Sequence, residues 1–160
     1  MKVISNASPI IALLKKNELN LLKNLFHRIV IPPSVKEELI KNDSKDFSQF
    51  NQLNNAIDKW ILIENADNLI IQESTLGKGE LEAINLSLKY RDCLLLMDEK
   101  KGRTIAKTMN IKTLGVLGIL ALAIKKDIKD KNEIIKNIET LLQQGFYLSS
   151  EVILFFLKSL

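Results

Sequence analysis

The sequence predicts one α/β domain in which a parallel β-sheet is covered by helices on both faces. Its 160 residues are 46% hydrophobic and 26% charged, which provides enough apolar surface for one self-sufficient core and argues against disorder. Short apolar runs have the length of buried strands, and most are separated by segments in which apolar residues recur with the period of a helix. Strands that are apolar on both faces and alternate with helices are typical of a parallel sheet covered on each side.

The individual elements follow from these patterns in chain order. Strands are expected at residues 3–4, 29–31, 61–63 and 94–97, with a fifth at 113–114. Helices are expected at residues 9–15, 19–25, 34–40, 50–60, 80–89, 103–109, 117–126 and 134–142, followed by a last helix capped by Ser149 or Ser150.

Specific residues predict where some of these elements begin and end. The capping-box spacing of Ser34 and Glu37 predicts that a helix begins at Ser34, directly after two prolines. Gly102 is expected to introduce a helix, and Gly145 to end one in a C-cap position. The polar stretches 42–48 and 64–68 are expected to be loops.

Charge and cysteine content indicate in which cellular compartment the protein works and which class of molecule it binds. The formal net charge of +4 is a mild excess that is compatible with a polyanionic partner. Cys93 is the single cysteine and cannot form an internal disulfide, so together with the lack of a signal peptide it favours a cytoplasmic protein. No uncharged run exceeds 12 residues, and the one at residues 113–124 is well short of the about 20 residues that a membrane helix needs, so no membrane span is expected.

Polar residues follow the expected strands at one edge of the sheet, where parallel sheets form their ligand sites. Clustered carboxylates repel one another, so such a group usually exists to bind a divalent cation, and ligands that are all oxygen suit Mg²⁺ or Mn²⁺. Asn6 and Ser8 follow the first expected strand, Glu38 lies on the helix after the second, Glu80 and Glu82 open the helix before the fourth, and Asp98 ends the fourth.

Each acid taken singly also has a structural interpretation. Glu80 opens a helix, where an anion is favoured by the helix dipole, and Glu38 is compatible with a solvated surface position. Asp98 differs, because a charge directly after a run of apolar strand residues needs a partner or solvent.

Four segments stand out in order along the chain, at residues 6–13, 31–39, 77–84 and 94–103. Together they resemble the PIN-domain ribonucleases, and in particular a branch related to VapC-type toxins of toxin–antitoxin pairs. The resemblance spans about residues 3–120, and residues 127–160 are interpreted as a helical extension of a single PIN-like domain over residues 1–160. It implies a parallel sheet that gathers acids to bind Mg²⁺ or Mn²⁺ and hydrolyse single-stranded RNA.

The resemblance also assigns roles to individual residues. It places Asn6 at the first acidic position, Glu38 at the second, Glu80 at the third and Asp98 at the fourth; these four are the expected catalytic and metal-binding residues. Ser8 and Glu82 are accessory candidates. Two positions depart from the family pattern, because Asn6 lacks the charge of an aspartate and Lys100 stands near the place of a further acid.

A basic cluster follows the fourth acidic position. Its members could hold RNA phosphates beside the metal, although such a run is also typical of a solvated helix face. They are Lys100, Lys101, Arg103 and Lys107. His27 and Cys93 are interpreted as structural, and no nucleotide-binding motif is present.

The leading functional hypothesis is therefore a metal-dependent endoribonuclease. The alternative is a catalytically weak PIN-like module that binds nucleic acid or regulates, and a receiver-like signalling domain fits the α/β pattern but not the four segments. The apolar tail 152–157 predicts a homodimer or a complex with an antitoxin helix. In the alternative, the protein is a monomer whose last helix packs on the edge of its own sheet.

Overall fold

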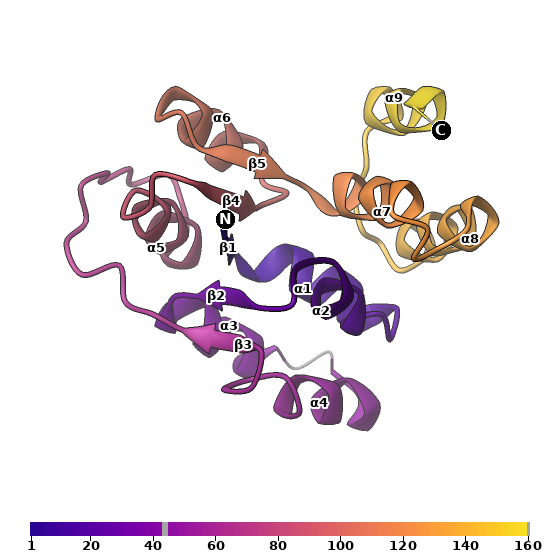
Figure 1. The fold of residues 1–160 in the computed structure, drawn as a ribbon, viewed down its shortest axis with the longest axis horizontal. Helices are drawn as coiled ribbons and strands as arrows, with labels where there is room; N and C mark the ends of the chain where they lie inside the picture. Colours follow the sequence, from indigo (N-terminus) through magenta and orange to yellow (C-terminus); the bar gives the residue numbers. More distant parts are fainter. Residues whose placement is uncertain (43–44, 160) are drawn as a thin grey trace.

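Five parallel strands form one sheet in the order β3-β2-β1-β4-β5 (Figure 1). The computed structural model describes residues 1–42 and 45–159. The strands are β1 (Lys2–Ser5), β2 (Ile29–Ile31), β3 (Ile61–Ile63), β4 (Cys93–Leu96) and β5 (Lys112–Leu114). In the register, Ile4 lies beside Val30 of β2 and beside Leu95 of β4. All five strands predicted from the apolar runs are confirmed, with shifts of one residue at some ends.

Helices connect the strands and extend the chain beyond the sheet. In the described residues they are α1 (Ala7–Lys15), α2 (Asn20–Phe26), α3 (Pro33–Lys41), α4 (Phe47–Asn54), α5 (Lys78–Ser87), α6 (Lys100–Thr108), α7 (Val116–Lys125), α8 (Lys131–Gln143) and α9 (Ser150–Ser159). None of them has the length and apolar character needed to cross a bilayer.

Two hydrophobic clusters cover the two faces of the sheet. Alternate strand residues point to opposite faces, so Val3 packs with α1, α2 and α7 while Ile4 packs with α5 and α6. Figure 1 shows α5 and α1 on opposite sides of the strands. Burial on both faces explains why the strands are apolar throughout, and it confirms the α/β class with helices on both faces.

The start of α3 differs from the sequence-based expectation. The helix begins at Pro33 with Pro32 as its N-cap, so the predicted capping box at Ser34 and Glu37 is wrong. Proline is favoured at the first helical position because its fixed φ suits the helix and its missing N–H is not needed there. Ser34 is left inside the first turn, where its hydroxyl is available to another element.

The helical pattern predicted over residues 50–60 also ends early. Helix α4 ends at Asn54, and Asp58 adopts a left-handed φ of 62° in the turn that leads into β3. Ile57 and Trp60 still pack into the core, but they do so from this turn. The helix-like spacing of apolar residues therefore extends beyond the residues that are helical.

The predicted loop 42–48 is too long, because the Asp46 side chain accepts the N–H of Gln49 and starts α4 at Phe47. Residues 43–44 of this loop lie outside the described part. Other boundaries agree more closely. Helix α6 begins before Gly102, because the Glu99 side chain caps it by accepting the N–H groups of Lys101 and Gly102. Gly145 follows α8 with a φ of 82°, as expected for a C-cap glycine. Ser149 Oγ accepts the N–H of Val152 and caps α9.

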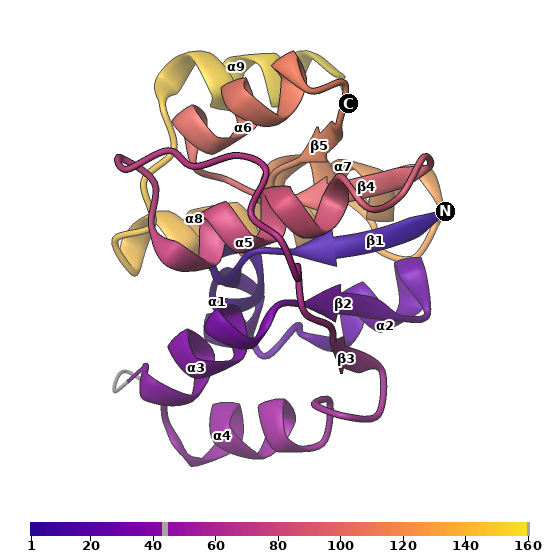
Figure 2. The same ribbon diagram turned by 90° about the vertical axis from the view of Figure 1, so that its left-hand side faces the viewer.

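The strand order places a topological switch point between β1 and β4. The chain moves from β1 to β2 and β3 on one side, then crosses to β4 and β5 on the other. Ligands in open α/β sheets bind outside the carboxyl ends of the strands at such a point. Figure 2 shows β1 and β2 pointing toward the end of the molecule where α3 and the start of α5 lie.

Candidate functional site

Asp98 follows β4 at the switch point and carries a carboxylate with one free oxygen. Its Oδ1 accepts the N–H of Val116 at 2.8 Å, at the start of α7. Its Oδ2 is buried and has no hydrogen-bond donor among the residues that the structure describes. Burial raises the pKa of Asp98, while the Val116 N–H and the Arg103 charge act in the opposite direction. A buried acceptor without a donor is costly, which makes Oδ2 available to a cation.

Gly115 allows the backbone at the start of α7 to approach this carboxylate. A Cβ atom at Gly115 would lie 2.9 Å from Asp98 Oδ1 and 3.4 Å from Arg103 Nη1. The first distance is too short for a real contact, and Asp98 Oδ1 is held by the Val116 N–H. Glycine at this position therefore permits the arrangement around Asp98.

Asn6 lies at the end of β1, beside β4. Its side chain is buried, with 3% exposure, and its Oδ1 accepts the N–H of Ser8 at 3.0 Å as the N-cap of α1. Its own N–H donates to Leu96 O at 3.0 Å, which ties it to the strand that leads to Asp98. The carbonyl oxygen expected to assist a metal is thus already used to start α1.

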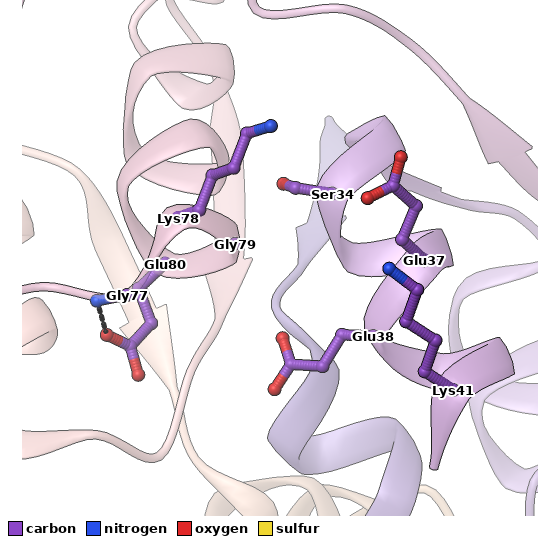
Figure 3. A pocket seen from close by; sticks show the side chains of 8 residues that line it. All are labelled: Ser34, Glu37, Glu38, Lys41, Gly77, Lys78, Gly79 and Glu80. Carbon is purple, nitrogen blue, oxygen red and sulfur yellow. Dashed lines mark hydrogen bonds between the residues drawn. The ribbon is translucent and has the colours of Figure 1, made fainter.

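Glu38 and Glu80 line one cavity between α3 and α5 (Figure 3). The cavity has a volume of about 350 Å³; α3 contributes Ser34, Glu37, Glu38 and Lys41, and residues 77–80 form the opposite wall. Partial burial, and next the charge of Glu80, raises the pKa of Glu38. Glu80 turns toward the chain before α5, where it accepts the N–H of Gly77 at 2.8 Å. That bond is the helix-opening role considered for Glu80 as the structural alternative.

Gly79 sets the close approach of the two walls. A Cβ atom there would lie 3.1 Å from Glu38 Oε2 and 3.2 Å from Val35 Cγ2. The first turn of α5 therefore packs directly against the side chain of Glu38.

Glu82 has a different position from Glu80, as their separation by two helical residues suggests. Its Oε2 accepts the hydroxyl of Ser34, and the Ser34 N–H lies 3.4 Å from the same oxygen. Glu82 thus links α5 to Ser34 in the first turn of α3, and Ser34 also lines the cavity with Glu38.

The four basic candidates of α6 are not equivalent. Lys101 forms an ion pair with Glu73 at 3.9 Å and donates to the Thr75 hydroxyl. Arg103 lies close enough to Asp98 to affect its pKa. Lys100 and Lys107 are exposed, without an ion-pair partner in the described part of the chain.

Two cavity lysines were not identified by the sequence analysis. Lys41 ends α3 and Lys78 begins α5, and both line the cavity with Glu38. Lys41 lies three residues after Glu38 and Lys78 lies two residues before Glu80, and this nearness to a motif acid was the available signal. Their common location became visible only when the two helices were placed side by side.

The acids do not gather into one tight cluster. Among the described residues, no three His, Cys, Asp or Glu side chains lie close enough to hold one metal ion. Glu38 and Glu80 share the cavity, while Asp98 and Asn6 belong to the switch point. The donors nevertheless fit Mg²⁺ or Mn²⁺, because they are all oxygen atoms and Mg²⁺ usually binds through one or two carboxylates with water completing its shell.

His27 and Cys93 have structural surroundings. His27 is exposed and ends α2 with a φ of 64°. Cys93 is buried, its thiol donates to Ser87 O at 3.4 Å, and burial raises its pKa. A thiol with a raised pKa is a poor nucleophile, which agrees with a packing role.

Comparison with known families identifies the class of this fold. The family model DUF3368, a PIN domain, matches residues 2–160. The chain belongs to the PIN-domain family. PIN domains are generally nucleases and typically use divalent metals, and the five-stranded parallel sheet flanked by helices is consistent with a PIN fold. No curated protein sequence matches this chain at a significant level.

Proposed function

We propose that this PIN domain is an endoribonuclease that depends on Mg²⁺ or Mn²⁺ and cleaves single-stranded RNA. The observation that carries the proposal is the buried Asp98 Oδ2 at the switch point, which no donor in the described residues satisfies. Glu38 and Glu80 supply further carboxylates, and Ser8 and the second lone pair of the Asn6 amide oxygen would assist at the end of β1.

The proposed chemistry divides between the ion and the chain. A bound divalent ion lowers the pKa of its water and stabilises charge on the phosphoryl group. Asp98 would hold the ion through Oδ2 while the Val116 N–H fixes its other oxygen. The repulsion between Glu80 and Glu38, which helps to raise the pKa of Glu38, would be relieved by a divalent ion in the cavity that these two residues line.

A cleavage assay tests this function. The wild type should cleave labelled single-stranded RNA when Mn²⁺ or Mg²⁺ is added, and EDTA should stop the reaction. Asp98→Asn removes the charge but keeps the shape, so its rate should fall on the order of 100-fold or more, because metal charge stabilisation is worth several kcal/mol. Equal background cleavage by the wild type and Asp98→Asn would refute a nuclease function at this site.

A second candidate function is supported by the position of Asn6. This residue carries no charge, and its carbonyl oxygen already accepts the Ser8 N–H. A catalytically weak module that binds nucleic acid or regulates is compatible with this arrangement. It predicts RNA binding without metal-dependent cleavage, so the same assay paired with a binding measurement separates the two functions.

We further propose that the chain acts as the toxin of a toxin–antitoxin pair and forms a homodimer. Support comes from α9, where Phe156 is buried against the core but Leu154 and Leu157 remain 55% and 46% exposed. The side chain of Phe155 lies outside the described part. An exposed apolar face on a helix is suited to a second copy or to an antitoxin helix. A small adjacent gene for a DNA-binding protein would support the antitoxin assignment, and its absence would oppose it.

A further inference from the structure

Two lysines stand on opposite walls of the Glu38 cavity. Lys41 is the last residue of α3 and Lys78 the first residue of α5, and both side chains are exposed (Figure 3). Neither amine forms an ion pair within the described residues, whereas Lys89, Lys101 and Lys129 are each paired with a glutamate. Both charges are therefore free to meet a ligand.

The charge balance of the cavity indicates when an anion can enter. Its lining contains three glutamates, Glu37, Glu38 and Glu80, against these two lysines. Without a cation the lining is net negative and repels phosphate. One divalent ion beside the glutamates reverses the balance, so that a polyanion is attracted only together with the metal.

The size of the cavity limits what it holds. Its volume of about 350 Å³ lies at the low end of ligand pockets, so it suits one unit of an extended chain. A lysine amine is a compact, hydrated charge on a flexible stem, and it binds phosphate without reading a base. A pair of such charges across a small cavity fits the backbone of a single strand.

We propose that Lys41 and Lys78 bind two backbone phosphates of single-stranded RNA on the two sides of the Glu38 cavity. The proposal rests on the proposed function for the identity of the ligand. The pair holds the strand across the acids and contributes affinity without sequence preference. It supplements the basic residues of α6, of which Lys101 already pairs with Glu73 and Arg103 lies beside Asp98.

Salt-dependent binding tests this role directly. All proteins keep Asp98, and Ca²⁺ replaces Mg²⁺ so that a divalent charge is present while cleavage is suppressed. Binding of fluorescently labelled single-stranded RNA is measured by anisotropy at fixed Ca²⁺ and increasing KCl. Each phosphate contact on a single strand contributes about 0.7 to the slope of log K against log salt. Lys41→Gln and Lys78→Gln should each reduce the slope by about 0.7, and the double variant by about 1.4.

Lys59→Gln is the matched control. Lys59 is also an exposed lysine, but it lies in the turn before β3, at the opposite end of the sheet. It should leave the slope unchanged, and circular dichroism should show all variants folded. Slopes for the cavity variants equal to that of Lys59→Gln would overturn the proposal.

The outcomes separate this inference from the proposed function. Metal-dependent cleavage by the wild type with unchanged slopes in the lysine variants would overturn the phosphate role alone. Reduced slopes in a protein whose wild type does not cleave would support the phosphate role and refute the nuclease function.

Discussion

Asp98→Asn should make the metal-free protein more stable while abolishing its cleavage. The Asn side chain keeps an oxygen for the Val116 N–H, now at 2.8 Å from Asp98 Oδ1. It removes a buried negative charge and replaces the Oδ2 atom that has no donor in the described residues. A stabilising substitution that destroys activity is expected where a protein keeps an unfavourable group for its function.

The expected gain follows from opposing contributions. A buried polar atom without a partner costs about 1–3 kcal/mol. Part of this gain is offset because the attraction to Arg103 is lost and the new amide needs an acceptor. We expect a net increase of about 1 kcal/mol in the free energy of unfolding, which raises the Tm by about 2–4 °C for a chain of this size.

The pH dependence has a definite sign. Burial raises the pKa of Asp98 above its ordinary value of 3.8, so the folded state binds this proton more tightly than the unfolded state does. The ionised group therefore destabilises the fold fully above the raised pKa, and this effect disappears as the pH falls toward 3.8. The stability advantage of Asp98→Asn should shrink over the same interval.

Urea unfolding of both proteins in EDTA over a series of pH values measures this difference. Glu139→Gln, which neutralises an exposed carboxylate on α8, is the control and should change stability by less than about 0.5 kcal/mol. Mn²⁺ at about 100 times its Kd should stabilise the wild type by about 2.7 kcal/mol and the variant far less. A variant that is less stable than the wild type, or a stability difference independent of pH, would refute the reasoning.

Three further predictions concern packing and association. Gly115→Ala places a Cβ atom 2.9 Å from Asp98 Oδ1. In urea titrations this substitution should lower the free energy of unfolding by about 1–3 kcal/mol. Unchanged stability would show that the carboxylate moves freely. The Asn85 side chain is bonded to the N–H and C=O of Ile71 at 2.8 and 2.9 Å, and Asn85→Ala leaves both groups without this partner. We expect the free energy of unfolding to fall by about 2–3 kcal/mol and proteolysis within residues 66–76 to become faster. Equal proteolysis rates would contradict this anchoring role. Leu154→Ser should dissociate the proposed dimer, as measured by light scattering. Because this side chain is 55% exposed, the substitution should change the stability of the monomer by no more than about 0.5 kcal/mol. A wild type that is already monomeric would refute the self-association proposal.

Local patterns were sufficient where one element carries its own signal. The strand at Ile29–Ile31 was predictable because its residues are apolar and buried on both faces of the sheet. The start of α3 was mispredicted, because the Ser34 hydroxyl that looked like a cap donates instead to Glu82 on another helix. A capping motif and a bridge between helices use the same serine, and sequence spacing does not distinguish them.

The sequence by itself determined the fold class and the order of the strands along the chain, because helix and strand periods are set by backbone geometry within a few residues. The candidate acids came from the resemblance of four segments to PIN domains. Only the tertiary structure decided that Lys41 faces the same cavity as Lys78, that Glu80 turns to Gly77, and that one oxygen of Asp98 lacks a donor in the described residues. These features depend on how helices from distant parts of the chain pack across the sheet, and packing brings together side chains that no local spacing relates.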